Sequence, residues 1–107
     1  MTPFVAIGAA EAHSLVRDGK AVMIDVRTHG ERIAARIPGT LHIPLDEFLD
    51  RLDEVPRDRT VILQCASGAR SAGVCAYLAR AGHPDVRNLH LGILGWHQDR
   101  LPLERGA

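Results

Sequence analysis

The sequence predicts an α/β fold in which a central five-stranded, mainly parallel sheet is flanked by helices on both faces. Strand-like and helix-like segments alternate along the whole chain, without a repeat or a long linker between them. Residues 21–26 (AVMIDV) and 60–64 (TVILQ) are nearly continuous apolar runs, which is typical of strands buried on both faces. The chain has 107 residues, of which 46% are hydrophobic, so we expect a single domain over residues 1–107.

The first half of the chain is expected to contain the first three strands. Residues 3–7 (PFVAI) suit a short edge strand, and Ala9–Arg17 suits a helix that Gly19 ends. Apolar residues recur at helical spacing across 45–52, which predicts a further helix. This helix is expected over Asp46–Val55. Between it and the second strand, at residues 21–26, we expect a helix over Glu31–Arg36, a turn at Pro38-Gly39 and a strand over Thr40–Ile43.

The second half is expected to contain the fourth and fifth strands, each followed by a helix. Residues 60–64 lead into a helix over Arg70–Ala81, and Gly82 caps that helix. Its apolar side carries small residues that allow the helix to lie close to a sheet: Ala72, Cys75, Ala76 and Ala79. Val86–His90 is the expected fifth strand, and Ile93–Asp99 forms a last short helix.

Charge and cysteine content exclude several classes of function. Thirteen basic and thirteen acidic residues give a net charge of zero, which disfavours a nucleic-acid groove or a membrane-binding patch. Two cysteines without a C-x-x-C pair, and six scattered histidines, predict neither a disulfide framework nor a metal site. The N-terminus has no basic region typical of a signal peptide, and polar residues interrupt the apolar stretch at 60–79. We therefore expect a cytoplasmic protein with no membrane span.

The chemistry is expected at residues 60–71 (TVILQ-CASGAR-S), where a buried strand ends at Cys65. Ligands bind beyond the carboxyl ends of strands in open α/β sheets. A loop that enters a helix N-terminus can turn its N–H groups toward the sulfur and favour a nucleophilic thiolate. Arg70 adds a planar cation that can orient an anionic substrate. The residues expected to form the substrate-binding loop are Ala66, Ser67, Gly68, Ala69, Arg70 and Ser71.

Three charged residues are expected to support this loop. Asp25 and Arg27 follow the second strand, at the same sheet edge as Cys65. We expect them to act by charge pairing, with Glu31 as a candidate partner. Cys75 lies on the apolar side of its helix and is expected to be inert packing. No histidine has a spacing that assigns it as a general base, and an ionised thiolate needs none.

Seven motifs, in the same order along the chain, resemble those of a single-domain rhodanese. They are D-V-R-T at 25–28, I-P-G-T at 37–40, I-P-L at 43–45, C-A-S-G-A-R-S at 65–71, V-R-N-L at 86–89, L-G-I-L-G-W at 91–96 and the final L-P-L-E. The resemblance covers about residues 4–105 and implies the rhodanese fold, with a five-stranded parallel sheet. It also implies sulfurtransferase activity without a metal or organic cofactor, in which Cys65 carries a persulfide and the backbone of residues 66–71 cradles it.

The same resemblance implies the partners of the reaction. They are a small-molecule sulfur donor such as thiosulfate and a thiol or cyanide acceptor, a thiol protein included. Glu31 matches the acidic residue of the family. Two places depart from the family pattern. Arg32 and Ala35-Arg36-Ile37 stand where the family usually has an aromatic residue and G-H-I, and Leu91-Gly92 replaces the usual paired glycine. Neither departure lies in the cysteine loop.

Three other functions are considered. The first is a cysteine-dependent phosphatase or arsenate reductase. The cysteine loops of those enzymes resemble C-x5-R, often with a histidine before the cysteine, whereas the loop of this chain is C-x4-R and follows Gln64. A shorter loop makes a smaller anion site, better suited to a terminal sulfur than to phosphate. A non-enzymatic rhodanese-like module usually lacks the loop cysteine that is present here. A sulfur carrier that delivers to a protein partner would use the same Cys65 chemistry.

Overall fold

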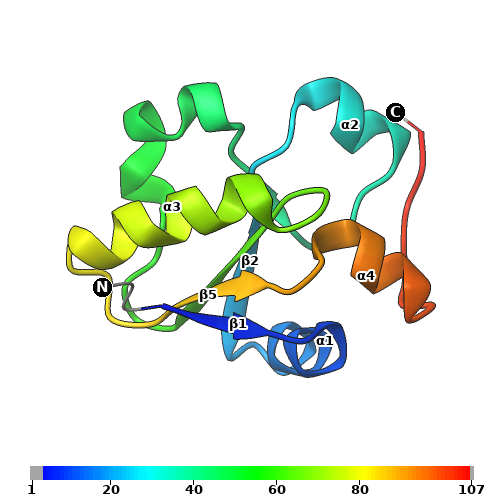
Figure 1. Ribbon diagram of the computed structural model, residues 1–107, viewed down its shortest axis with the longest axis horizontal. Helices are drawn as coiled ribbons and strands as arrows, with labels where there is room; N and C mark the ends of the chain where they lie inside the picture. The colour runs from blue at the N-terminus through cyan, green and yellow to red at the C-terminus, as the bar shows by residue number, and fades with distance from the viewer. Residues whose placement is uncertain (1–3, 107) are drawn as a thin grey trace.

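The computed structural model describes residues 4–106, and its centre is a sheet of five parallel strands (Figure 1). The strands are paired in the order β1-β5-β4-β2-β3, and every pair is parallel. Their bounds are β1 (Val5–Ile7), β2 (Ala21–Asp25), β3 (Leu41–His42), β4 (Thr60–Gln64) and β5 (Val86–Leu89). The predicted α/β class is confirmed. Residue 3 of the first expected strand lies outside the described residues.

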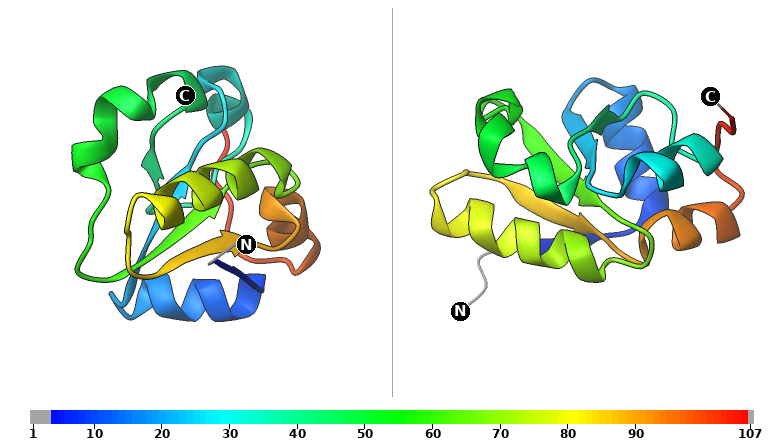
Figure 2. Two further views of the ribbon diagram at one scale, coloured as in Figure 1. Left: turned by 60° about the vertical axis from the view of Figure 1, so that its left-hand side comes forward. Right: turned by 90° about the horizontal axis from the view of Figure 1, so that it is seen from above.

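Helices cover both faces of the sheet, as Figures 1 and 2 show. The four α-helices are α1 (Ala9–Arg17), α2 (His29–Ala34), α3 (Ala69–Arg80) and α4 (Gly92–Gln98). Val61 and Leu63 pack with α3 in one core cluster, whereas Ile62 packs with α1 and α4 in the other. Neighbouring side chains of a strand point to opposite faces, so β4 has to be apolar throughout.

The connections of the sheet create a crevice between β2 and β4. The chain leaves β2 toward β3 at one edge, whereas it leaves β4 toward β5 on the other side. This reversal is the place where open α/β sheets bind ligands. Asp25 and Gln64 are paired at the carboxyl ends of these two strands. The residues that follow them, Val26 and Cys65, therefore begin side by side.

The helix expected over Asp46–Val55 is wrong in type. The structure has two short 3-10 helices instead, Leu45–Glu47 and Leu49–Glu54, and the backbone leaves helical geometry at Arg51 (φ −122°, ψ 23°). Of the leucine and phenylalanine residues that recur at helical spacing, only Phe48 is fully buried. One anchored side chain does not require a continuous amphipathic helix, and short 3-10 turns are common as connectors.

The helix expected over Glu31–Arg36 differs from the structure at its ends, since α2 spans His29–Ala34. The helix expected from Glu31 starts at His29, because Thr28 caps it. The Thr28 hydroxyl accepts a hydrogen bond from the Glu31 N–H, and the Glu31 carboxylate accepts one from the Thr28 N–H. This capping box fixes the position of Glu31. Among residues 4–106, no helix is long and apolar enough to cross a membrane.

Leu91 has a left-handed backbone conformation, with φ of 62°, at the start of α4. This conformation costs a residue with a side chain about 1 kcal/mol or more relative to glycine. Because the Leu91 side chain is 49% exposed, its loss removes little packing. We expect Leu91→Gly to raise the free energy of unfolding by about 1 kcal/mol, measured by urea denaturation.

Leu94→Gly is the matched control for this prediction. Leu94 is 56% exposed but lies inside α4, where glycine costs about 1 kcal/mol of helix stability. The two variants should therefore change stability in opposite directions. A lower stability of Leu91→Gly would show that its backbone conformation is not strained.

Candidate active site

Cys65 follows β4 directly, and its side chain is almost completely buried. Gly68 adopts a left-handed conformation (φ 104°), which turns the short loop back toward the sulfur before α3 begins. Cys65 Sγ accepts hydrogen bonds from the Gly68 N–H at 3.1 Å and the Ser71 N–H at 3.4 Å. The Ser71 hydroxyl lies 3.3 Å from the same sulfur. The loop is thus wrapped around one sulfur atom.

The pKa of the Cys65 thiol lies below its ordinary value. Burial acts to raise this pKa, because it disfavours a charged sulfur. Hydrogen bonds from the Ser71 hydroxyl and from the N–H groups of Ser71, Gly68 and Ser67 act in the opposite direction and together outweigh burial. The arrangement therefore favours a thiolate, the nucleophilic form of cysteine.

Alkylation should report this difference directly. A lowered pKa means that the thiolate is populated at lower pH, so the rate of Cys65 alkylation should reach half of its maximum below the free-cysteine value of about 8.5. Cys75 is the internal control, because burial raises the pKa of its thiol to about 12. Mass mapping of the alkylated peptides should find Cys65 modified and Cys75 protected. A Cys65 midpoint at or above the free value would contradict the argument.

Arg70 and Glu31 form a two-pronged ion pair at the rim of the loop. The two terminal nitrogens of Arg70 each donate to one carboxylate oxygen of Glu31, both at 2.8 Å. The Arg70 hydrogen bonds hold the pKa of Glu31 down at about 2, against its partial burial. Glu31 is therefore ionised throughout the neutral range. Because Thr28 orients Glu31, the capping box of α2 also fixes the Arg70 guanidinium at the rim of the loop.

Asp25 and Arg27 bind each other rather than the carboxylate of Glu31. Arg27 Nε and Nη2 donate to the two oxygens of Asp25 at 3.0 and 2.9 Å, and both side chains are buried. Arg32 also reaches Asp25, at 3.3 Å. These contacts tie the end of β2 to α2, so their link to the cysteine loop is indirect. The carboxylate that contacts the loop arginine is that of Glu31.

Comparison with known proteins agrees with this geometry. Residues 8–99 match the family model of the Rhodanese-like domain. The chain belongs to this family. It is 40% identical over 82 residues to a sulfurtransferase of Allochromatium vinosum, which covers 77% of each chain. It is 29% identical to the thiosulfate sulfurtransferase GlpE of Glaesserella parasuis, over 96% of this chain and 95% of that one.

A solved structure extends the agreement to the fold. A rhodanese-related protein of Thermoplasma volcanium superposes on this chain with a TM-score of 0.86 and 26% identity. The match covers 94% of this chain and 98% of that one. The rhodanese fold and the sulfurtransferase relatives expected from the motifs are thus confirmed.

In this rhodanese-like domain, the N-terminus of α4 forms hydrogen bonds with the backbone of the cysteine loop. The N–H groups of Ile93 and Leu94 donate to the carbonyl oxygens of Cys65 and Ala66, at 2.9 and 3.1 Å. A side chain at Gly92 would lie 2.6 Å from the Ala66 oxygen and closer still to that of Cys65. These contacts fix the carbonyl groups of the loop on the side of α4, whereas the N–H groups of Gly68 and Ser71 point to the sulfur. Sequence reasoning missed this role, although the motif at 91–96 contains the residues.

Asn88 is a second contact that sequence reasoning missed. It lies on β5, and its Oδ1 is 2.6 Å from the Ser71 hydroxyl. Its Nδ2 donates to the carbonyl oxygen of Gly68 at 3.0 Å. The asparagine within V-R-N-L was the available signal, but nothing in that motif indicates which loop it touches.

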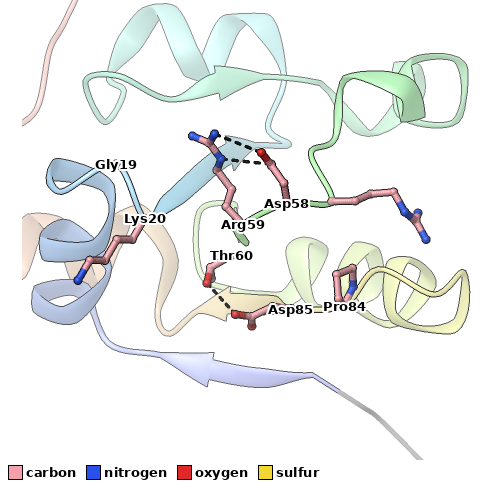
Figure 3. A pocket seen from close by; sticks show the side chains of 8 residues that line it. Gly19, Lys20, Asp58, Arg59, Thr60, Pro84 and Asp85 are labelled. Carbon is pink, nitrogen blue, oxygen red and sulfur yellow. Dashed lines mark hydrogen bonds and ion pairs between the residues drawn. The ribbon is translucent and has the colours of Figure 1, made fainter.

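Several hollows lie on the surface of the described residues, and three of them bear on the site. One, of about 490 Å³, lies at the opposite edge of the sheet, near Thr60 at the start of β4. Figure 3 shows that Arg59 points toward Asp58 and that Thr60 and Asp85 face each other, so the charged groups do not converge on a common point. Two smaller hollows, about 260 and 210 Å³, adjoin Arg70. In the described part of the chain, no three His, Cys, Asp or Glu side chains are grouped as metal ligands.

Proposed function

We propose that this rhodanese-like domain is a thiosulfate sulfurtransferase that carries sulfur as a persulfide on Cys65. The observation that carries the proposal is the buried sulfur at the N-terminus of α3, which accepts hydrogen bonds from two backbone N–H groups and faces a hydroxyl. The named activity of the Glaesserella parasuis relative supports thiosulfate as the donor. Residues 1–107 act as one rhodanese domain in this proposal.

The first half of the cycle loads the sulfur. The Cys65 thiolate attacks the outer sulfur of thiosulfate, a new S–S bond forms, and the S–S bond of thiosulfate breaks. Its electron pair leaves with sulfite. The N–H groups of residues 66–71 stabilise the negative charge that develops on the outer sulfur of the persulfide. Arg70 binds the oxygens of thiosulfate and of the departing sulfite.

The second half unloads the sulfur. Cyanide or a thiolate attacks the outer sulfur, which leaves as thiocyanate or as a new persulfide, and the electron pair of the broken bond restores the Cys65 thiolate. Electrons and atoms balance without a metal or an organic cofactor. A thiol acceptor has to be reduced, so the proposal includes a location in the cytoplasm. The thiol can belong to a small molecule or to a protein.

Intact-mass spectrometry tests the proposal. The protein treated with thiosulfate should gain the mass of one sulfur atom, located on Cys65 by peptide mapping. Addition of a thiol should then remove it. Hydrolysis of an aryl phosphate, with no sulfur adduct after thiosulfate, would overturn the sulfurtransferase proposal in favour of phosphatase activity.

Arg70→Ala should weaken donor binding more than it slows turnover. Hydrogen bonds to charged groups contribute about 1.5–3 kcal/mol, so the KM for thiosulfate should rise on the order of tenfold or more. The kcat should fall less, because backbone N–H groups hold the sulfur. Arg70→Lys is the matched variant, since it keeps the charge but loses the two-pronged contact with Glu31. An unchanged KM with a collapsed kcat would assign Arg70 to the transition state instead.

A further inference from the structure

A chain of hydrogen-bonding side chains links the sulfur of Cys65 to β5. Ser71 Oγ lies 3.3 Å from Cys65 Sγ and 2.6 Å from Asn88 Oδ1. Asn88 Nδ2 lies 3.0 Å from the carbonyl oxygen of Gly68. The cysteine loop, the first turn of α3 and the neighbouring strand are therefore connected at the sulfur itself.

The contact with Gly68 decides which way the Asn88 amide faces. A backbone carbonyl oxygen only accepts hydrogen bonds, so the group that points at it has to be the Nδ2 donor. Oδ1 consequently faces Ser71, and it too can only accept. The Ser71 hydroxyl, 2.6 Å away, can therefore form a hydrogen bond with Asn88 only by donating its proton.

Ser71 has one hydroxyl proton, and two acceptors lie within its reach. While Cys65 is a neutral thiol, its S–H can donate to Ser71 Oγ, and Ser71 can keep its own proton on Asn88. Once the thiol has lost its proton to solvent, no S–H remains. The hydroxyl then has to turn away from Asn88 in order to donate to the thiolate.

We propose that Asn88 is a positioning residue that competes with the Cys65 sulfur for the hydroxyl proton of Ser71. The hydroxyl turns to the sulfur while Cys65 is a thiolate, and it returns to Asn88 when the charge moves to the outer sulfur of the persulfide. This competition limits how strongly the loop stabilises the thiolate. The nucleophilicity of a thiolate falls as it is stabilised, so the limit preserves its reactivity. The catalytic meaning of this inference rests on the proposed function, whereas the competition itself does not.

A double-mutant cycle on Asn88 and Ser71 separates this role from simple support of the loop. The pH midpoint of Cys65 alkylation by iodoacetamide is measured in the wild type, Asn88→Ala, Ser71→Ala and the double variant. Asn88→Ala frees the hydroxyl for the thiolate and should lower the midpoint by on the order of half a pH unit. Ser71→Ala removes the donor and should raise it. In the Ser71→Ala background, Asn88→Ala should cause no further shift.

The other charged or titratable groups near the sulfur are the same in all four proteins. They are the Arg70–Glu31 pair between α3 and α2, the Asp25–Arg27 pair at the end of β2, and Cys75 in α3. Thermal unfolding checks that each variant is folded. Asn88→Leu, which has nearly the same volume, replaces Asn88→Ala if the smaller side chain destabilises the strand.

Four results overturn the inference: an upward shift or no shift in Asn88→Ala, an equal shift in both backgrounds, or no rise in Ser71→Ala. An equal shift in both backgrounds would show that Asn88 acts only through Gly68. Iodoacetamide reacts with Cys65 whether or not thiosulfate does, so the cycle remains readable if no persulfide forms. Absence of a sulfur adduct in intact-mass spectrometry would overturn the proposed function, whereas the alkylation midpoints alone decide this inference.

Discussion

Cys65→Ser should abolish sulfur transfer, with a loss of at least about a thousandfold in thiosulfate:cyanide activity. A serine hydroxyl is not ionised at neutral pH and cannot form a persulfide, so no other group in the loop replaces the sulfur. The fold should be retained, because serine is similar in size and the N–H groups of Gly68 and Ser71 can donate to its oxygen. Thiocyanate formation and intact mass after thiosulfate are the two measurements.

Cys75→Ser is the matched control for this result. Cys75 lies fully buried among the core residues under α3, and burial raises the pKa of its thiol to about 12. Its thiol is therefore not ionised at neutral pH. The variant should lose some stability, because a hydroxyl replaces an apolar sulfur in the core, yet it should keep most of the activity. Lost activity in a folded Cys75→Ser protein would show that a second thiol takes part.

Gly92→Ala should be the most damaging change outside the cysteine itself. The added methyl group would overlap the carbonyl oxygens of Cys65 and Ala66, and the backbone at Gly92 has a positive φ of 55°. These oxygens belong to the loop backbone and cannot move without moving the loop. We expect a loss of about 3 kcal/mol or more in the free energy of unfolding. Sulfur transfer should fall in parallel, because the N–H groups of the loop no longer converge on the sulfur.

Gly73→Ala provides the comparison. Gly73 lies within α3, and nothing stands within 4 Å of the position its methyl group would take. Alanine favours a helix by about 1 kcal/mol over glycine, so this variant should be slightly more stable than the wild type. Urea denaturation and thiocyanate assays on both proteins make the comparison. Equal stability of the two variants would contradict the role assigned to Gly92.

The parts of the fold that follow from local patterns could be predicted from the sequence. Ala9–Arg17 and Thr60–Gln64 have the expected bounds, because a capped amphipathic segment and a doubly buried strand leave clear patterns in a single sequence. The segment at 45–54 could not be predicted in the same way. Its apolar spacing fits an α-helix, but only the tertiary structure shows that Phe48 alone is fully buried among those residues.

The candidate site also has a part that could be predicted from the sequence and a part that could not. Cys65 and its loop are adjacent in sequence, so their composition alone indicated a thiolate site. The partners of that loop come from distant segments: Glu31 from α2, Asn88 from β5 and Gly92 from α4. The pattern of a single sequence does not show which of its acidic residues contacts Arg70. That pairing depends on the strand order, which brings β2 beside β4.

The edge strand β1 also has a consequence for the order in which the molecule forms. Val5 pairs with Arg87 and Ile7 with Leu89, so within this sheet the first strand along the chain pairs with the last one. During synthesis on the ribosome, β2 and β4 can pair before β5 has emerged, whereas β1 cannot yet pair with β5. Until then Ile7, which is buried in the finished protein, lacks its neighbour Leu89 on β5. The pairing of β1 is therefore a late step of folding, which leaves this edge strand exposed to other contacts while β5 is still being synthesised.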